Sequence, residues 1–178
     1  MVWKRQIMEA TGRARKLKEL ESGRIKRPDE GRRSTFHMEY KENALTYEDY
    51  IRLRESVNWL NFSKEQAERG LANSLYDVVA IEGGNIIGMG RMVGDGLYNL
   101  IVDVVVCPEY QKRGIGTGLM KRLTKYAKEC TPPGGRTSLQ LIAEKGKEPF
   151  YEKMGFKKIP HEFCGSGMRK VIYQMEKA

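Results

Sequence analysis

Residues 99–128 constrain the fold more than any other stretch of this chain. An apolar run from Leu100 to Cys107, interrupted only by Asp103, is typical of a strand that is buried on both faces. Pro108 ends the strand, and an amphipathic helix follows whose first turn carries Gly114, Gly116 and Gly118. The sequence therefore predicts a strand, a Gly-rich turn and a helix in that order.

Such a turn favours an anionic ligand. Glycines let a ligand approach the backbone closely, and the free N–H groups and dipole of a first helical turn attract an anion, most often phosphate. Lys112 and Arg113 add positive charge at this point. A dinucleotide fingerprint needs G-x-G-x-x-G and a later acidic residue, but the turn reads G-x-G-x-G and the later region reads TPPGGR. A phosphate loop of the Walker type is also absent, because Gly-Lys-Ser/Thr is missing.

The pattern V-x-P-x-Y-Q-K-R-G-I-G-x-x-L, which ends at Leu119, resembles the acetyl-coenzyme A motif of the GNAT-type N-acetyltransferase superfamily. A second stretch, EPFYEKMGF at 148–156, resembles the helix and strand that lie beside coenzyme A in that family. The resemblance runs from Glu39 to the C-terminus. It implies an α/β (α+β) fold, with a mixed, mostly antiparallel central sheet of about six to seven strands flanked by about four helices.

The resemblance also implies the cofactor site, in which backbone amides bind the pyrophosphate of acetyl-CoA, the co-substrate. The predicted cofactor-binding residues are Val105, Val106, Gln111, Lys112, Arg113, Gly114, Ile115, Gly116, Thr117 and Gly118. No metal is expected, because the three cysteines have no C-x-x-C spacing and only two histidines are present.

Hydrophobic periodicity and turn residues place the other elements. Capping-box patterns at Thr46 and Ser63 predict two helices, and Gly83 and Gly84 predict a hairpin turn. The expected strands are 39–43, 76–82, 86–94, 99–107, 137–144, 156–159 and 168–175, and the expected helices are 46–57, 63–75, 115–130 and 147–154. The helix at 115–130 should make the strand at 137–144 parallel to that at 99–107. Family geometry implies that these two strands splay apart around the cofactor.

Acyl transfer needs a neutral amine, although a free alkylamine has a pKa of about 10.4. Asp103, the one charge in the central strand, stands where some family members place a base, acting directly or through water. It could equally be a structural carboxylate paired with Arg91 or another cation. The resemblance assigns the oxyanion donors to backbone N–H groups near a bulge around Val105 or Val106.

Tyr151 stands at the family's position for the acid that protonates the coenzyme A thiolate. The alternative is a tyrosine packed with Phe150 against the sheet. Trp59 and Phe62 lie in the segment that borders the acceptor in the family, although they could equally belong to the core. Many relatives carry an Asn shortly before the tyrosine, and here that region is occupied by 144–146 (Glu-Lys-Gly), which leaves one acceptor or cofactor contact without its usual residue.

The net charge of +9 belongs mainly to the N-terminal part. We divide the chain into a basic, flexible extension at 1–37 and an acetyltransferase domain at 38–178, because Met38 begins a stretch that looks like the ordinary start of such a domain. The extension is an arm for nucleic acid, ribosome or anionic membrane, a solvated extension, or the result of a translation start placed too far upstream. No apolar run is long enough to span a membrane, and a cytoplasmic protein is the simplest interpretation.

The sequence therefore predicts an N-acetyltransferase that moves an acetyl group from acetyl-CoA to a primary amine by direct attack in a ternary complex. Asp103 favours a small cationic acceptor over a protein or peptide amine. The alternatives are a non-catalytic acyl-CoA sensor, an acetyltransferase for protein or peptide amines, and a nucleic-acid or ribosome adaptor that uses the extension. We do not expect nucleic-acid binding, and the resemblance allows a homodimer through C-terminal strands.

Overall fold

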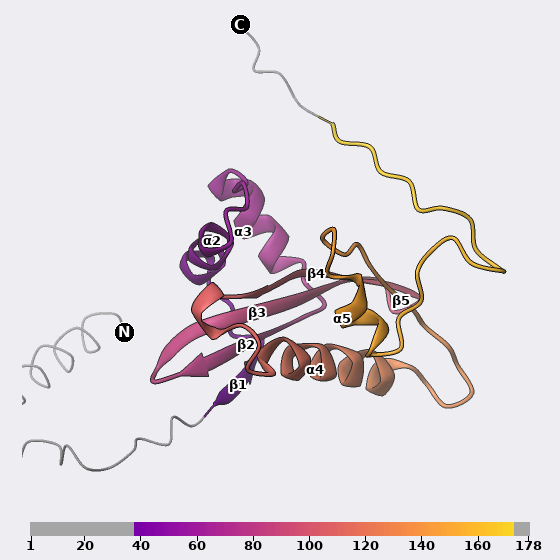
Figure 1. Cartoon of the computed structure of the whole chain (residues 1–178), viewed down its shortest axis with the longest axis horizontal. Helices are drawn as coiled ribbons and strands as arrows, with labels where there is room; N and C mark the ends of the chain where they lie inside the picture. The colour runs from indigo at the N-terminus through magenta and orange to yellow at the C-terminus, as the bar shows by residue number, and fades with distance from the viewer. Residues whose placement is uncertain (1–37, 173–178) are drawn as a thin grey trace, which may run out of the picture. The chain divides into compact units, whose positions relative to one another are not determined.

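A computed structural model describes residues 38–172 (Figure 1). The expectations for the extension at 1–37 lie outside these residues. The described part is one unit built on a five-stranded sheet in the order β1-β2-β3-β4-β5. The strands are β1 (Glu39–Glu42), β2 (Tyr76–Glu82), β3 (Asn85–Gly94), β4 (Tyr98–Val106) and β5 (Ser138–Leu141). The helices are α2 (Tyr47–Ser56), α3 (Lys64–Ala72), the 3₁₀ turn η1 (Pro108–Tyr110), α4 (Ile115–Cys130) and α5 (Glu148–Glu152).

The sheet is mixed and mostly antiparallel, as expected. β1 to β4 pair antiparallel with their neighbours, and β5 pairs parallel to β4 after the α4 crossover. Gly83 and Gly84 have positive φ angles at the β2–β3 turn, as the hairpin pattern predicted. The capping interactions at Thr46 and Ser63 are also present. The predicted α/β class is therefore confirmed.

Two hydrophobic clusters cover the two faces of the sheet. The helices α2 and α3 lie on one side of the sheet and α4 lies on the other (Figure 1). Successive residues of a strand point to opposite faces, so Val78 packs in the cluster with α4, whereas Val79 packs in the cluster with α2. The α4 cluster also includes the partly buried side chains of α5, among them Phe150 and Tyr151. The α2 cluster contains Val105 and Cys107 at the end of β4. β4 therefore has the predicted cofactor turn at its end and a helical layer on each face.

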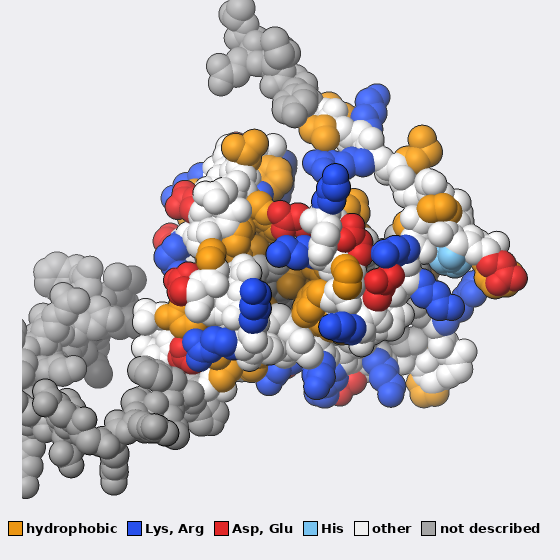
Figure 2. Space-filling model, in the orientation of Figure 1, with side chains coloured by type: hydrophobic (Ala, Val, Ile, Leu, Met, Phe, Trp, Pro, Cys, Tyr) orange, Lys and Arg blue, Asp and Glu red, His pale blue; other side chains and the backbone are white. Residues whose placement is uncertain are grey.

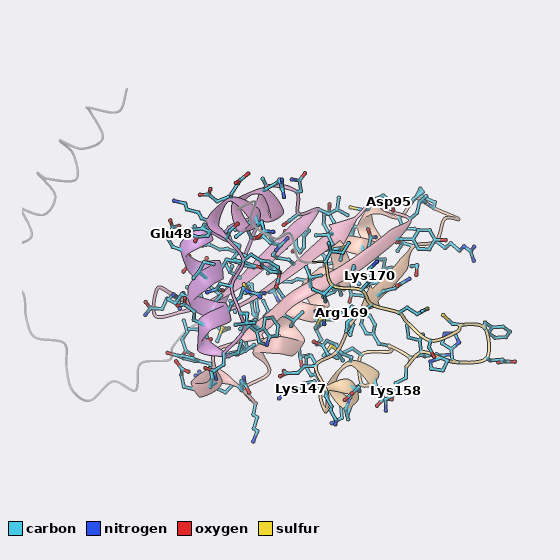
Figure 3. All side chains as sticks on the ribbon, turned by 90° about the horizontal axis from the view of Figure 1, so that it is seen from above. Glu48, Asp95, Lys147, Lys158, Arg169 and Lys170 are labelled. Carbon is cyan, nitrogen blue, oxygen red and sulfur yellow. The ribbon has the colours of Figure 1, made fainter. Side chains whose placement is uncertain are left out.

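The predicted count of six to seven strands is too high, because the described residues hold five. No strand forms at 156–159 or 168–172, and the rest of the predicted last strand lies outside the described residues. Pro160, Gly165 and Gly167 lie between these two predicted strands and disfavour a strand that would continue across 160–167. Apart from the partly buried Phe156, the side chains of this C-terminal segment are exposed, including the labelled Arg169 and Lys170 (Figure 3), so little burial compensates for ordering it as a strand.

Candidate acetyl-CoA site

The turn before α4 presents a row of backbone N–H groups. Gly114 caps the helix with φ +82°, and Lys112 has φ +61°, so the backbone turns sharply on both sides of Arg113. The N–H groups of 112–117 have no hydrogen-bond partner among the described residues. Unpaired N–H groups at the positive end of a helix dipole favour an anion. The geometry thus fits the pyrophosphate contact expected for this turn.

Two side chains fix the turn to the sheet. Arg113 donates from Nη1 to Glu82 at 3.2 Å, makes a second, shorter contact through Nη2, and stacks on Tyr110. Gln111 donates from Nε2 to the carbonyl of Val106 at 3.0 Å. Arg113 and Gln111 were predicted as cofactor-binding residues, and both side chains have protein partners. Their first effect is to hold the turn in place, while any contact with the cofactor stays a prediction.

Glu82→Gln is expected to weaken acetyl-CoA binding by roughly three- to tenfold, since it replaces a charge-assisted pair by a neutral hydrogen bond and loosens the turn. Isothermal titration calorimetry measures this change. Glu152→Gln is the matched control, because Glu152 pairs with Lys158 at the surface and both side chains are largely exposed. Equal affinity in Glu82→Gln and the control would show that the pair does not position the turn.

The second and third glycines of the turn are close-packed rather than open. A Cβ at Gly116 would lie 3.2 Å from Cζ of Phe150, which brings α5 against the first turn of α4. A Cβ at Gly118 would overlap the ring of Tyr40, whose hydroxyl donates to the carbonyl of Ile115 at 3.3 Å. Packing against Tyr40 accounts for a glycine at 118 without a ligand, whereas a cofactor contact there stays a prediction.

Gly118→Ala is expected to destabilise the protein by about 1–3 kcal/mol, because the added methyl group must push Tyr40 or α4 aside. Gly70→Ala in α3 is the control: nothing lies within 4 Å of a Cβ there, and the change should be neutral or stabilising by up to about 1 kcal/mol. Urea unfolding measures both. In a Tyr40→Ala background Gly118→Ala should cost less than it does in the parent, because the ring that it meets is gone. An equal cost in the two backgrounds would rule out the overlap with Tyr40 as its cause.

β4 and β5 pair only from Tyr98 to Ile101 on the β4 side, so the outer edge of 102–106 has no strand beside it among the described residues. This agrees with the expected splay. The N–H of Cys107 donates to β3, to the carbonyl of Ile87 at 2.9 Å. Because successive N–H groups of a strand alternate in direction, the N–H of Val106 points to the open edge and that of Val105 points to β3. Val106 is therefore the better placed of the two predicted donors.

The bulge lies earlier in β4 than expected. Met89 is opposite Val105 and Arg91 is opposite Val102, which leaves Asp103 and Val104 facing the single residue Gly90. The prediction of a bulge around 105–106 is corrected to 103–104. Asp103 has φ +51°, a left-handed conformation that Asp tolerates better than most residues. The extra residue changes the alternation of the strand and turns the Asp103 side chain toward α2 and α3.

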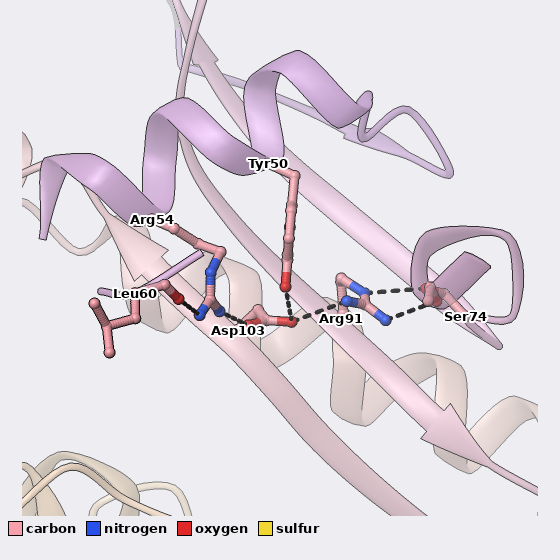
Figure 4. Close-up of polar contacts among 7 residues, drawn as sticks. Tyr50, Arg54, Leu60, Ser74, Arg91 and Asp103 are labelled. Atoms are coloured by element: carbon pink, nitrogen blue, oxygen red, sulfur yellow. Dashed lines mark hydrogen bonds and ion pairs between the residues drawn. The ribbon is translucent and has the colours of Figure 1, made fainter. Parts of the chain in front are cut away.

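Asp103 is at the centre of a buried ion-pair network (Figure 4). Arg54 of α2 donates to Oδ1 at 2.6 Å, and Arg91 of β3 donates to Oδ2 at 2.9 Å. Arg91 also donates to Ser74 and to the carbonyl of Gly70, so it ties the end of α3 to the sheet. The structural interpretation of Asp103, as a carboxylate paired with Arg91 or another cation, therefore describes its geometry. Both carboxylate oxygens already accept from an arginine, and Oδ2 also accepts from the hydroxyl of Tyr50 at 3.5 Å. A role as base stays a prediction.

Trp59 and Phe62 both lie on the guanidinium of Arg54, with ring centroids 5.3 and 5.0 Å from its central carbon. Trp59 is half-buried, whereas Phe62 is exposed. Neither ring is in the fully buried core, and both belong to the segment that joins α2 to α3. The structure brings this segment together with Asp103 through Arg54. Contact of the two rings with an acceptor stays a prediction.

Tyr151 lies in α5, next to the residue that packs on Gly116. Its ring contacts Phe150 and Phe156 edge to face, as the packing alternative predicted. Its hydroxyl, however, has no hydrogen-bond partner among the described residues. Burial raises the pKa of Tyr151 above its ordinary value, and the carboxylate of Glu144 raises it further. The hydroxyl is thus protonated at neutral pH and available to donate a proton.

The sequence profile of the acetyltransferase (GNAT) domain matches residues 39–177. The chain belongs to the GNAT acetyltransferase family. This confirms the expected family, and with it an acetyltransferase domain from a family that uses acetyl-CoA as co-substrate. The GNAT domain has 31% identity to a probable acetyltransferase of Staphylococcus aureus, whose crystal structure superposes with a TM-score of 0.68 over 77% of this chain and 100% of that one. A GNAT-family protein of Streptococcus pneumoniae gives 31% identity and a TM-score of 0.66, with 78% and 100% covered.

Among curated proteins, the GNAT domain resembles serotonin N-acetyltransferase 2, chloroplastic, of rice, with 30% identity over 64% of this chain and 57% of that protein. It also resembles the uncharacterized N-acetyltransferase YjcF of Bacillus subtilis, with 28% identity over 71% and 89%. The chain therefore spans little more than half the length of the rice relative. The described residues hold no helix long and apolar enough to cross a bilayer.

Three residues that shape this site were not predicted from the sequence: Tyr40, Arg54 and Glu82. A signal existed for Arg54, because it follows Leu53 and lies four residues after Tyr50 on the apolar side of the predicted helix, where a charge needs a partner. Tyr40 and Glu82 carry no such signal, since their contacts join segments far apart in the sequence.

Lys and Arg side chains follow the lower edge of the domain over α4 (Figure 2). The exposed lysines of this helix are Lys121, Lys125 and Lys128.

Proposed function

We propose that this GNAT domain transfers the acetyl group of acetyl-CoA to the primary amine of a small molecule, by direct attack in a ternary complex. The observation that carries the proposal is the row of N–H groups at 112–117, which follows closely on the outer edge of β4. Within residues 38–172, these N–H groups have no hydrogen-bond partner and the edge at 102–106 has no partner strand. The N–H groups at 112–117 suit the pyrophosphate, and the open edge of β4 suits the amide-containing arm of the cofactor. The serotonin acetyltransferase named among the relatives supports a small-molecule acceptor.

In the proposed reaction the neutral amine attacks the thioester carbonyl and forms a tetrahedral intermediate. The N–H of Val106 faces the open edge and donates to the oxyanion. Collapse breaks the carbon–sulfur bond, and Tyr151 gives its proton to the departing thiolate. The proton lost from nitrogen goes to water, which later restores that of Tyr151. Asp103 contributes through its ion pairs with Arg54 and Arg91, which fix the bulge at 103–104, two residues before Val106.

Calorimetric titration with acetyl-CoA, followed by thiol release against a panel of amines, tests the proposal. The panel contains serotonin, spermidine, glucosamine, free amino acids and a short peptide with a free N-terminus. Micromolar binding with release by a small amine supports the proposal. Release only by the peptide would replace it with acetylation of protein or peptide amines, binding without release would favour an acyl-CoA sensor, and no binding would exclude both.

A homodimer and a cytoplasmic location complete the proposal. Light scattering on the purified chain measures its mass in solution, and a single-chain mass would rule out the dimer. Fractionation of the source cells locates the protein, and recovery from an organelle would overturn the cytoplasmic assignment.

A further inference from the structure

Arg54 joins two parts of the site that are distant in the sequence. Its side chain is 9% exposed and donates from Nη1 to Asp103 at 2.6 Å and from Nη2 to the carbonyl of Leu60 at 2.5 Å (Figure 4). Asp103 belongs to the β4 bulge, and Leu60 belongs to the connection between α2 and α3, residues 57–63, which we call the acceptor-side loop. Nε of Arg54 is buried and has no hydrogen-bond partner among the described residues.

The acceptor-side loop is wrapped around Arg54. The N–H of Trp59 donates to the carbonyl of Arg54 at 3.0 Å, and the rings of Trp59 and Phe62 lie on its guanidinium. The side chain of Leu60 is 90% exposed, so the buried polar and ring contacts hold the loop more than Leu60 packing does. A cation that lies over aromatic rings gains more when it is desolvated, as Arg54 is.

A shift of Arg54 would be transmitted through Asp103 to the bulge of β4 and to the oxyanion donor that follows it. The bulge at 103–104 sets the alternation of the strand and therefore which backbone N–H groups face the open edge. Asp103 holds this bulge in its left-handed conformation through Arg54 and Arg91. Arg91 reaches α3, whereas Arg54 alone of the two binds the acceptor-side loop.

We propose that Arg54 is a positioning residue for acetyl transfer, which keeps the acceptor-side loop and the oxyanion donor of β4 in one fixed geometry. The proposal rests on the proposed function. Lysine cannot replace the guanidinium, because one ammonium lacks the planar fork that reaches a carboxylate and a carbonyl while it stacks on rings. Displacement of reacting groups by about 1 Å costs up to about 100-fold in rate.

The fluorescence of Trp59 reports the conformation of the acceptor-side loop independently of enzyme activity. The chain has two tryptophans, so Trp3→Phe leaves Trp59 as the single tryptophan, whose emission is excited selectively at wavelengths that tyrosine does not absorb. In that background Arg54→Lys should increase the acrylamide quenching of Trp59 at least twofold. The matched control is Arg52→Lys: Arg52 lies in the same helix, but its partners are Asp49 and the carbonyl of Ile86. Quenching in the control should equal that of the parent.

The kinetic part uses acetyl-CoA and the best amine of the panel. Arg54→Lys should lower kcat by roughly 10- to 100-fold and raise KM for the amine, while the affinity for acetyl-CoA changes less than about twofold, since the turn at 112–117 is intact. Arg52→Lys should leave all three values unchanged. A folded Arg54→Lys variant with greater quenching but full kcat and an unchanged amine KM would overturn the proposal, because the loop would move without consequence.

A second variant covers a failure of Arg54→Lys to fold. Phe62 is 53% exposed, so Phe62→Leu removes one stacked ring with little effect on the core. Phe62→Leu should raise the quenching of Trp59 and lower kcat at saturating amine by about threefold or more. Quenching and kcat that both equal those of the parent would overturn the proposal. If no amine is acetylated, the proposed function fails and the catalytic role of Arg54 fails with it; the quenching series then shows separately whether Arg54 holds the loop.

Discussion

Tyr151→Phe is expected to lower kcat by about 10²- to 10⁴-fold, the usual contribution of a general acid. The substitution removes only the hydroxyl, which has no partner among the described residues, and it keeps the ring contacts with Phe150 and Phe156. Folding and acetyl-CoA affinity should therefore stay close to those of the parent. Steady-state thiol release gives kcat, and calorimetry gives the affinity.

The pH profile gives a second test of Tyr151. A general acid works in its protonated form, so its contribution is lost as pH rises through its pKa. Burial and Glu144 raise the pKa of Tyr151 above the ordinary value of about 10. The kcat of the parent should therefore show no fall from Tyr151 up to about pH 10. Tyr126→Phe is the control, because that hydroxyl donates to the carbonyl of Leu75 and serves no reacting group. Equal kcat in parent and Tyr151→Phe would return Tyr151 to a packing role.

Asp103→Asn is expected to lower the free energy of unfolding by about 3–5 kcal/mol, the range for removing one partner of a buried ion pair. The substitution leaves Arg54 and Arg91 buried, with side chains 9% and 7% exposed, and without a counter-charge between them. Urea unfolding of the parent and the variant measures the loss.

The same variant separates the two roles of Asp103. Asp95→Asn is the control, because Asp95 accepts backbone hydrogen bonds from Leu97 and Tyr98 in an exposed turn and should cost at most about 1 kcal/mol. If Asp103→Asn were as stable as the parent but inactive, the carboxylate would be a base rather than a structural counter-ion. A large loss of stability with residual activity in the folded fraction would support the structural role.

The sequence was sufficient for most of the fold because local rules decide it. Glycines and capping residues predicted the β2–β3 turn and the starts of α2 and α3, and apolar periodicity predicted α4. The prediction of C-terminal strands was wrong for a different reason. The stretch at 168–172 has strand-forming residues, but a strand also needs a partner strand, and pairing cannot be read from composition.

The site was only partly predictable for a similar reason. A motif identifies Gly114 and Gln111, but the bulge at 103–104 depends on the register between β3 and β4, and one extra residue changes the face to which Asp103 points. Neither the partners of Asp103 nor the contact of Tyr40 with Gly118 follows from spacing along the chain. These contacts arise only after the strands have paired.

The strand order of the sheet has a consequence for how the molecule folds. Because β1 to β5 lie side by side in the order of the chain, each strand needs only to find the one made just before it. Short loops close quickly between β2, β3 and β4, whereas β5 must wait for the whole of α4. We therefore expect the part from β1 to β4, which includes Arg54 and Asp103, to form early on a growing chain. The edge of the sheet beside β5 and α5 should be completed last.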